Sequence, residues 1–350
     1  MKHYIGMDLA SEVTTVSVMT KEGKLKMSTA VCTSESNLKQ LVKSVKGPKQ
    51  VVFEECGLAS WLYSVLEPVC DDVFVCNPKK NKDLSGNAKG DDSDAFNLAE
   101  RARLSCLSRV WHGGKHVQAL KDRLRDYQVM TKESTALKNR IKAIFRNRGI
   151  SIGTKAYDQQ TRDQALLLLE QQALRTRVTH LGEVLDVVCK QRASAQKELI
   201  KVARKSRMFK PLISMPQIGE IHAASIIGEV GEPHRFRTRN QFWSYCGFAV
   251  KVYESGEYYA DKRGMVRKKD RKATTRGLVS ECNRTLKYVF KNVALNLAAR
   301  DWSHEFERLQ ESGVYVTNAR LTLSRKAAAI ALHLMKTGEN YDEALVFARK

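Results

Sequence analysis

The chain has 350 residues and a formal net charge of +22, from 60 lysines and arginines against 38 aspartates and glutamates. This length allows two or three domains, and no apolar run is long enough to cross a bilayer. The first residues lack the apolar core of a signal peptide, and the eight cysteines form no Cys-x-x-Cys pair, so we expect neither a zinc site nor a disulfide framework.

The first part of the chain alternates short apolar strands with helices, which predicts an α/β sheet layered by helices. Three strands come first, and then helix and strand alternate until a final helix begins near residue 91. This order is typical of a ribonuclease-H-like fold. The predicted strands cover residues 4–8, 13–19, 25–31, 51–54 and 72–76, and the predicted helices cover 38–45, 58–66 and a segment from 91.

Carboxylates stand at the ends of these elements. Asp8 ends the first strand, and Glu54 ends a later one. Asp91 and Asp94 are three residues apart, so they face the same way on the first turn of their helix. Function in open α/β sheets gathers at the carboxyl ends of strands, where such carboxylates could hold Mg²⁺, or a pair of ions ~3.5–4 Å apart. Alternatively, the acidic residues simply favour a helix start.

The positive charge is unevenly distributed. Residues 1–110 hold 15 of the 60 basic and 14 of the 38 acidic residues, which leaves 45 basic and 24 acidic residues for the rest. The first part is therefore nearly neutral and the remainder strongly basic. A polyanion is the partner that this predicts, and nucleic acid is the first candidate. We expect no membrane partner, because no basic helix carries a bulky aromatic face.

Two long helices are predicted in the middle of the chain. Apolar residues recur at intervals of three and four from Val117 to Ile144, and again from Leu181 to Val202. These two rows of apolar residues, here called seams, predict an antiparallel hairpin or an intermolecular coiled coil. An ordinary helical bundle is the alternative. Arg192 interrupts the second seam.

The last part of the chain is predicted to be mostly helical. Pro216 to Gly219 form a tight turn between two short apolar helices, which resembles a helix-hairpin-helix and could offer backbone N–H groups to a phosphate. The aromatic residues from Phe236 to Phe248 are expected to pack a small core. A dense basic run then favours phosphate contacts. Its cations are Lys262, Arg263, Arg267, Lys268, Lys269, Arg271, Lys272 and Arg276.

These motifs, in this order, resemble those of the DEDD transposases of bacterial insertion sequences, the bridge-RNA-guided recombinases related to Piv-type DNA invertases. The resemblance covers nearly the full length. It selects Glu54 rather than Glu55 and leaves Asp92 a bystander. The matching blocks are Ile5-Gly6-Met7-Asp8, Phe53-Glu54-Glu55-Cys56-Gly57, Lys89-Gly90-Asp91-Asp92-Ser93-Asp94-Ala95, Met215-Pro216-Gln217-Ile218-Gly219 and Glu254-Ser255-Gly256.

The resemblance implies a RuvC-like domain over residues 1–108, a coiled-coil middle over 109–208 and a C-terminal transposase domain over 209–350. In it, Asp8, Glu54, Asp91 and Asp94 hold Mg²⁺, and Ser255 is the nucleophile that attacks a DNA phosphate. The implied partners are DNA, a structured guide RNA and further copies of the chain, in a dimer or tetramer. We expect such a protein in the cytoplasm, associated with the nucleoid.

Two alternatives remain at this stage. A RuvC-like junction nuclease would need the carboxylates but would hydrolyse DNA with water, without Ser255. A catalytically inactive relative would keep only its nucleic-acid-binding surface. Retention of all four carboxylates in the sequence favours an enzyme.

Overall fold

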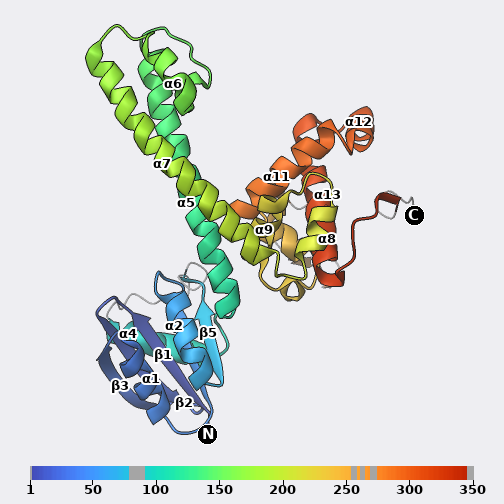
Figure 1. The fold of residues 1–350 in the computed structure, drawn as a ribbon. Coiled ribbons are helices and arrows are strands. Elements are labelled where there is room, and N and C mark those ends of the chain that lie inside the picture. Colours follow the sequence, from blue (N-terminus) through green and yellow to red (C-terminus); the bar gives the residue numbers. More distant parts are fainter. Residues whose placement is uncertain (1, 79–90, 254–257, 261–264, 269–273, 345–350) are drawn as a thin grey trace. The chain divides into compact units, whose positions relative to one another are not determined.

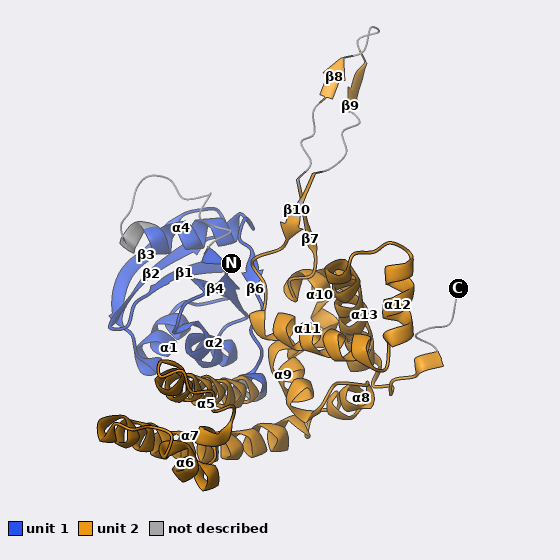
Figure 2. Cartoon of the chain, turned by 90° about the horizontal axis from the view of Figure 1, so that it is seen from above, with its two compact units in different colours: residues 1–118 blue, residues 119–350 orange. Residues whose placement is uncertain are grey.

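A computed structural model describes residues 2–78, 91–253, 258–260, 265–268 and 274–344 (Figure 1). The chain divides into two compact units, residues 1–118 and 119–350 (Figure 2). The first unit is a mixed α/β sheet and the second is largely helical, which confirms the predicted fold class at this level. The finer boundaries at residues 108 and 208 stay a prediction.

Unit 1 is built on a six-stranded sheet with the strand order β3-β2-β1-β4-β5-β6. Strand β1 runs antiparallel to β2 and parallel to β4, and β4 runs parallel to β5. All five predicted strands are present, and β6 is an addition too short to leave a sequence pattern. The strands are β1 (His3–Leu9), β2 (Val13–Thr20), β3 (Leu25–Cys32), β4 (Lys49–Glu54), β5 (Asp72–Cys76) and β6 (Arg109–Val110).

Helices cover both faces of this sheet. Side chains alternate between the faces along a strand, so Ile5 and Met7 of β1 share one face. Both belong to the core formed with α1 (Glu35–Ser44) and α2 (Ala59–Leu66), and a 3₁₀ turn at Glu67–Val69 follows α2. Tyr4 lies on the other face, in a smaller core with α4 (Asp91–Arg103). The sheet is thus the middle of three layers.

A glycine lets α4 approach β1 closely. A Cβ atom added at Gly6 would overlap the carbonyl oxygen of Ala95 and would lie 2.6 Å from the backbone nitrogen of Ala99. Both obstacles are helix backbone, which cannot swing aside as a side chain can. Strand β1 therefore holds α4 at a distance that only glycine at this position permits.

We predict that Gly6→Ala destabilises unit 1 by about 1–3 kcal/mol or more, because the added methyl group forces α4 off the sheet. Thermal unfolding measures the change in melting temperature. Gly57→Ala is the matched control, since a Cβ atom there would meet nothing within 4 Å. Equal melting temperatures for the two variants would show that the helix can retreat without cost.

Unit 2 begins with two long helices, α5 (Lys115–Arg146) and α7 (Gln172–Ala203), which run side by side in Figure 1. Ile141 and Phe145 of α5 share a buried cluster with Val178 and Leu185 of α7. A 3₁₀ turn at Lys155–Tyr157 and helix α6 (Gln159–Leu166) pack into the same cluster. The predicted pair of long helices is therefore present, and a coiled coil stays a prediction.

An ion pair with one buried partner lies at this end of the helix pair. Arg162 of α6 is 6% exposed and donates two hydrogen bonds, of 2.8 and 2.6 Å, to the carboxylate of Asp186. Gly182 makes room for it, because an added Cβ would lie 2.5 Å from the guanidinium carbon of Arg162. This contact fixes α6 against α7.

The rest of unit 2 is a helical body around one large core. Phe236, Phe242 and Phe248 are buried in it, which confirms the core role predicted for the aromatic segment, and Trp302 joins them from later in the chain. Its elements are α8 (Phe209–Ser214), α9 (Glu220–Val230), a 3₁₀ turn at Pro233–Arg235, α10 (Arg239–Tyr245), α11 (Arg284–Ala299), α12 (Ser303–Glu311) and α13 (Val316–Thr337).

Two small antiparallel sheets in unit 2 were not predicted. Strand β7 (Val250–Tyr253) pairs with β10 (Thr274–Leu278), and β8 (Tyr258–Ala260) pairs with β9 (Val266–Lys268). These strands are short and mostly exposed, so no alternation of apolar and polar residues marks them. None of the helices in the described part of the chain is both long and apolar enough to cross a membrane.

The turn between α8 and α9 has a strained backbone. Gln217 adopts a φ of +64°, in the left-handed region where glycine is favoured. Its side-chain amide donates a 2.7 Å hydrogen bond to the carboxylate of Asp301, which helps to offset the roughly 1–2 kcal/mol cost of this conformation. The turn predicted at Pro216 to Gly219 is thus present, and phosphate binding there stays a prediction.

Candidate active site

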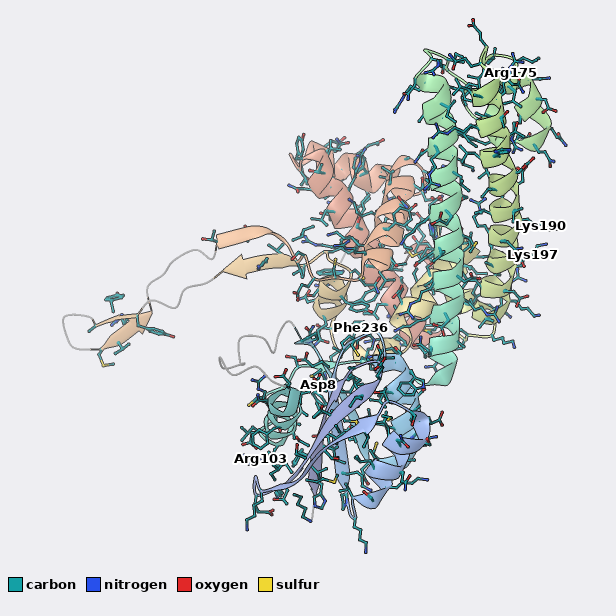
Figure 3. The ribbon with its side chains drawn as sticks, turned by 90° about the vertical axis from the view of Figure 1, so that its left-hand side faces the viewer. Asp8, Arg103, Arg175, Lys190, Lys197 and Phe236 are labelled. Atoms are coloured by element: carbon teal, nitrogen blue, oxygen red, sulfur yellow. The ribbon has the colours of Figure 1, made fainter. Side chains whose placement is uncertain are left out.

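Strand register brings Asp8 and Glu54 to the same edge of the sheet. Met7 of β1 lies opposite Phe53 of β4, and the next residue along each strand is one of these two carboxylates. Neighbouring strands of a sheet lie ~4.8 Å apart, so these two residues are close together. Since Met7 and Phe53 point into the α1–α2 core, the residues that follow them point to the face covered by α4. Figure 3 labels Asp8 near the end of β1.

Asp94 joins them from α4. The pKa of the Glu54 carboxyl is raised, first by burial and then by the charges of Asp8 and Asp94. Asp94 directly precedes Ala95, whose carbonyl oxygen lies against Gly6 of β1, two residues before Asp8 on the same face of the sheet. The structure therefore gathers side chains from two strands and one helix at one place. Their catalytic role stays a prediction.

Arg101 also faces this group, and sequence analysis missed it. Its positive charge lowers the pKa of Glu54, against the effect of the carboxylates. The available signal was spacing, because Asp94 and Arg101 are two helical turns apart on α4 and share one face. The positive charge of the guanidinium partly offsets the electrostatic repulsion among the clustered carboxylates.

Carboxylate oxygens that repel one another suit a hard divalent cation such as Mg²⁺, which prefers oxygen ligands. The pKa of Glu54 is raised first by burial and then by the charges of Asp8 and Asp94, while Arg101 acts in the opposite direction. Among the residues whose side chains are described, no group of three or more His, Cys, Asp and Glu is arranged to hold a metal ion. The side chain of Asp91 lies outside the described residues.

Most of the predicted C-terminal site also lies outside the described residues. This is true of Ser255 and of Lys262, Arg263, Lys269, Arg271 and Lys272. The backbone of Lys268 lies in β9 and that of Arg276 in β10, but their side chains are not described. Arg267 lies in β9, opposite Tyr259, which is 45% exposed. The one cation of the basic run whose side chain is described, Arg267, therefore lies on a strand that pairs with a strand carrying an exposed tyrosine.

Two family models match the chain. A transposase model of the DEDD type, named for IS110, matches residues 5–147, and one described as the transposase IS116/IS110/IS902 family matches residues 210–304. Together they cover more than half of the chain. The chain belongs to the IS110 family of insertion-sequence transposases. The resemblance predicted from the sequence is thereby confirmed.

A transposase for the insertion sequence element IS1111A from Coxiella burnetii (strain RSA 493 / Nine Mile phase I) is similar to this transposase. The two are 24% identical over 260 residues, which make up 72% of this chain and 70% of the relative. The first family model includes Asp8, Glu54, Asp91 and Asp94, and the second includes Ser255. A transposase is an enzyme that acts on DNA, which agrees with the predicted partner.

The raised pKa of Glu54 has a consequence for stability. The folded protein binds this proton at higher pH than the unfolded chain does, so ionised Glu54 destabilises the fold above its folded pKa. We predict that Glu54→Gln raises the melting temperature at pH 7 in EDTA. The gain should shrink as the pH falls toward about 4.3, the ordinary glutamate value.

Thermal unfolding from pH 7 to pH 4, without divalent metal, measures this effect. Glu12→Gln is the control, because Glu12 is exposed in the same unit. A melting temperature for Glu54→Gln below that of the unsubstituted protein at pH 7 would contradict the prediction.

Proposed function

We propose that this transposase cuts and rejoins DNA strands with Asp8, Glu54, Asp91 and Asp94 in unit 1 and Ser255 in unit 2. The observation that carries the proposal is geometric: β1 and β4 end side by side at Asp8 and Glu54, on the face where α4 carries Asp94. If the only role of Asp91 and Asp94 were to favour the start of α4, there would be no reason for this helix to bring Asp94 to the ends of β1 and β4.

The fold of unit 1 supports this function. Its three antiparallel strands are followed by two parallel ones in the order β3-β2-β1-β4-β5. This is the arrangement expected of a ribonuclease-H-like, RuvC-like domain, and the carboxylates lie where such an open sheet places its chemistry.

Asp8, Glu54, Asp91 and Asp94 would hold Mg²⁺. When bound, the metal supplies positive charge that stabilises the attacking and leaving oxygens in phosphoryl transfer. The protein's own contribution is position. Asp8 and Glu54 are fixed by adjacent parallel strands, and Asp94 is fixed by a helix that Gly6 holds against the same sheet.

Ser255 would supply the nucleophile. Its Oγ attacks a DNA phosphorus, a serine–phosphate bond forms, and the bond from phosphorus to one deoxyribose oxygen breaks. The released hydroxyl, or one from another DNA end, then attacks the phosphoserine and frees the serine. The number of phosphodiester bonds is conserved, so rejoining needs no ATP.

The remaining partners follow from charge and from the family. Residues 111–350 carry most of the net positive charge, which suits DNA and a structured guide RNA that selects the sites by base pairing. A dimer or tetramer, joined through α5 and α7, would let the serine of one copy meet the carboxylates of another. The α8–α9 turn could serve as a helix-hairpin-helix phosphate contact.

We predict that Ser255→Ala abolishes a covalent protein–DNA adduct while leaving DNA binding nearly unchanged, because only the attacking oxygen is removed. Denaturing gels of protein incubated with Mg²⁺, element-end DNA and the RNA that co-purifies with it measure the adduct. Ser280→Ala is the matched control, since Ser280 is an exposed serine of the same unit.

Asp91→Asn should also abolish the adduct, because both halves of the site are required. Cleavage without any adduct in the unsubstituted protein would favour the junction nuclease that uses water. An adduct that persists in Ser255→Ala would mean that another residue is the nucleophile.

The basic run should govern the salt dependence of DNA binding. The logarithm of the DNA-binding constant falls linearly with the logarithm of the salt concentration. Each phosphate contact that is lost should make this slope less steep by about 0.9 on duplex DNA. We predict a flatter slope after Lys262, Arg263, Lys268 and Lys269 are all replaced by Gln, measured by fluorescence anisotropy between 50 and 200 mM salt.

The control replaces four lysines of the nearly neutral unit 1, all exposed, by Gln: Lys21, Lys24, Lys26 and Lys46. Its slope should match that of the unsubstituted protein. A slope left unchanged by the first variant would place the basic run away from the DNA.

A further inference from the structure

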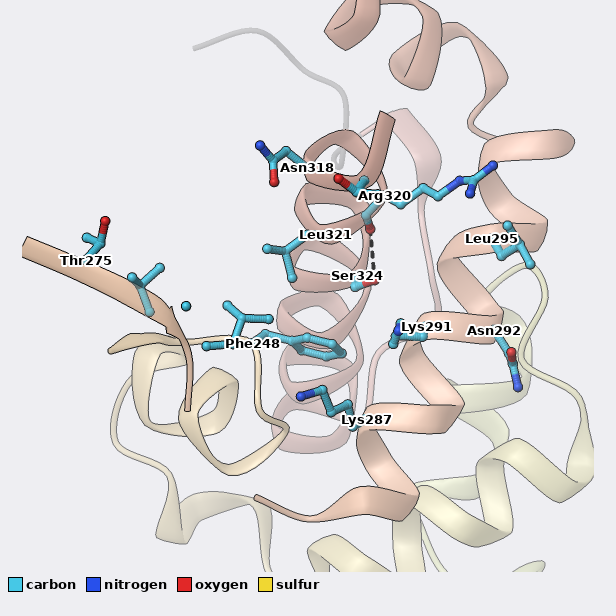
Figure 4. A pocket seen from close by; sticks show the side chains of 14 residues that line it. Phe248, Thr275, Lys287, Lys291, Asn292, Leu295, Asn318, Arg320, Leu321 and Ser324 are labelled. Carbon is cyan, nitrogen blue, oxygen red and sulfur yellow. Dashed lines mark hydrogen bonds between the residues drawn. The ribbon is translucent and has the colours of Figure 1, made fainter. Parts of the chain in front are cut away.

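A cavity of about 650 Å³ lies in unit 2 where the β7–β10 ribbon meets α11 and α13 (Figure 4). This volume is within the range of about 300–1,000 Å³ typical of small-ligand sites. The lining residues named below are all in the described part of the chain. Among the described residues, the basic run reaches it only at Arg276, which lies on β10 between the lining residues Thr275 and Gly277.

The floor of this cavity is rigid. Phe248 is 1% exposed, and its carbonyl oxygen accepts hydrogen bonds of 2.9 and 2.6 Å from the guanidinium of Arg325. The indole N–H of Trp243 in turn donates a 2.8 Å hydrogen bond to the carbonyl oxygen of Arg325. A site held in this way needs little rearrangement to receive a ligand.

The charged groups at the cavity are all positive. Lys287 and Lys291 approach it from α11 and Arg320 from α13, and no aspartate or glutamate is among its described lining residues. The sequences of α11 and α13 contain no acidic residue at all. The ligand should therefore carry negative charge.

The other walls are apolar, with amide groups at the margin. Val250, Leu278 and Leu321 provide the apolar surface, and Asn292 and Asn318 provide hydrogen-bonding groups. A simple anion such as phosphate would leave the apolar surface unused. A nucleotide has an anionic phosphate, a base with apolar faces and a base edge that forms hydrogen bonds, so it matches all three kinds of wall.

The β7–β10 ribbon, which forms one wall of the cavity, contains a β-bulge at this point. Thr275 pairs with Val252 and Leu278 with Val250, so β10 carries one extra residue between the two pairs. Gly277, at this bulge, has a φ of +66° and lines the cavity. A bulge bends its strand and commonly borders a functional site.

We propose that this cavity receives one unpaired nucleotide of the DNA strand on which the transposase acts, with its phosphate near Lys287, Lys291 and Arg320. The choice of DNA rests on the proposed function, since Val250 precedes Ser255 by five residues, at most ~17 Å of extended chain. When one nucleotide is held out of the base stack in this way, the DNA backbone beside it is exposed to the enzyme. Enzymes that act on a base flip it out of the duplex in the same manner.

The probe is a DNA duplex with a single unpaired thymidine, compared with the fully paired duplex by fluorescence anisotropy. The Ser255→Ala variant is used throughout, so that the result does not depend on the identity of the nucleophile. Burial of roughly 40 Å² of base surface corresponds to about a fivefold preference for the bulged duplex.

Asn318→Trp should abolish this preference, because Asn318 is exposed on α13 and the larger ring fills the cavity without a change in charge. Thr322→Trp, one turn further along α13 and outside the lining, should keep it. Likewise, Lys291→Gln should reduce the preference, whereas Arg284→Gln, on the same helix but outside the lining, should not.

Three results would overturn the proposal. They are equal binding of the two duplexes, a preference that survives Asn318→Trp, and a larger preference for the same bulge in an RNA duplex, which would make RNA the ligand. Failure of the serine proposal would show itself separately, as an adduct that persists after Ser255→Ala.

Discussion

The contact between β1 and α4 is the constraint on which the candidate site depends. Gly6 lets the helix backbone lie against the strand, two residues before Asp8 on the same face. The separation of Asp94 from the strand carboxylates is thereby set by a backbone contact, which is stiffer than any side-chain contact. A site that must gather like charges needs such a fixed frame, because repulsion pushes its members apart.

The sheet could be predicted from the sequence because strands buried by helices on both faces read as apolar runs, and Glu54 and Asp8 interrupt those runs at their ends. The order of strands and helices along the chain followed from this pattern, and the spatial order of the strands came from the structure. Arg101 escaped prediction because an arginine in the last turn of a helix is ordinary on its own. Only the fold shows that it lies near Glu54.

Unit 2 was less predictable for physical reasons that differ from place to place. The β7–β10 ribbon is short and exposed, and its register contains a bulge, so neither period nor composition marks it. The described lining of the cavity beside it comes from four separate segments of the chain, and each of its lysines looks like ordinary helix surface in sequence. The long helices, whose buried positions repeat regularly, were found from sequence, α5 with nearly its observed ends, whereas α7 begins at Gln172, nine residues before the predicted start.

The pair of Arg162 and Asp186 determines how the far end of the α5–α7 pair can be assembled. Arg162 is buried and Asp186 is 30% exposed, so removal of the aspartate is the more costly change, because it leaves the buried guanidinium without its partner. Sliding α6 along α7 by even one residue would break the bidentate contact and drive the guanidinium out of the space that Gly182 leaves. The ion pair therefore defines the register of α6 on α7, and with it how the connection between the two long helices closes at this end.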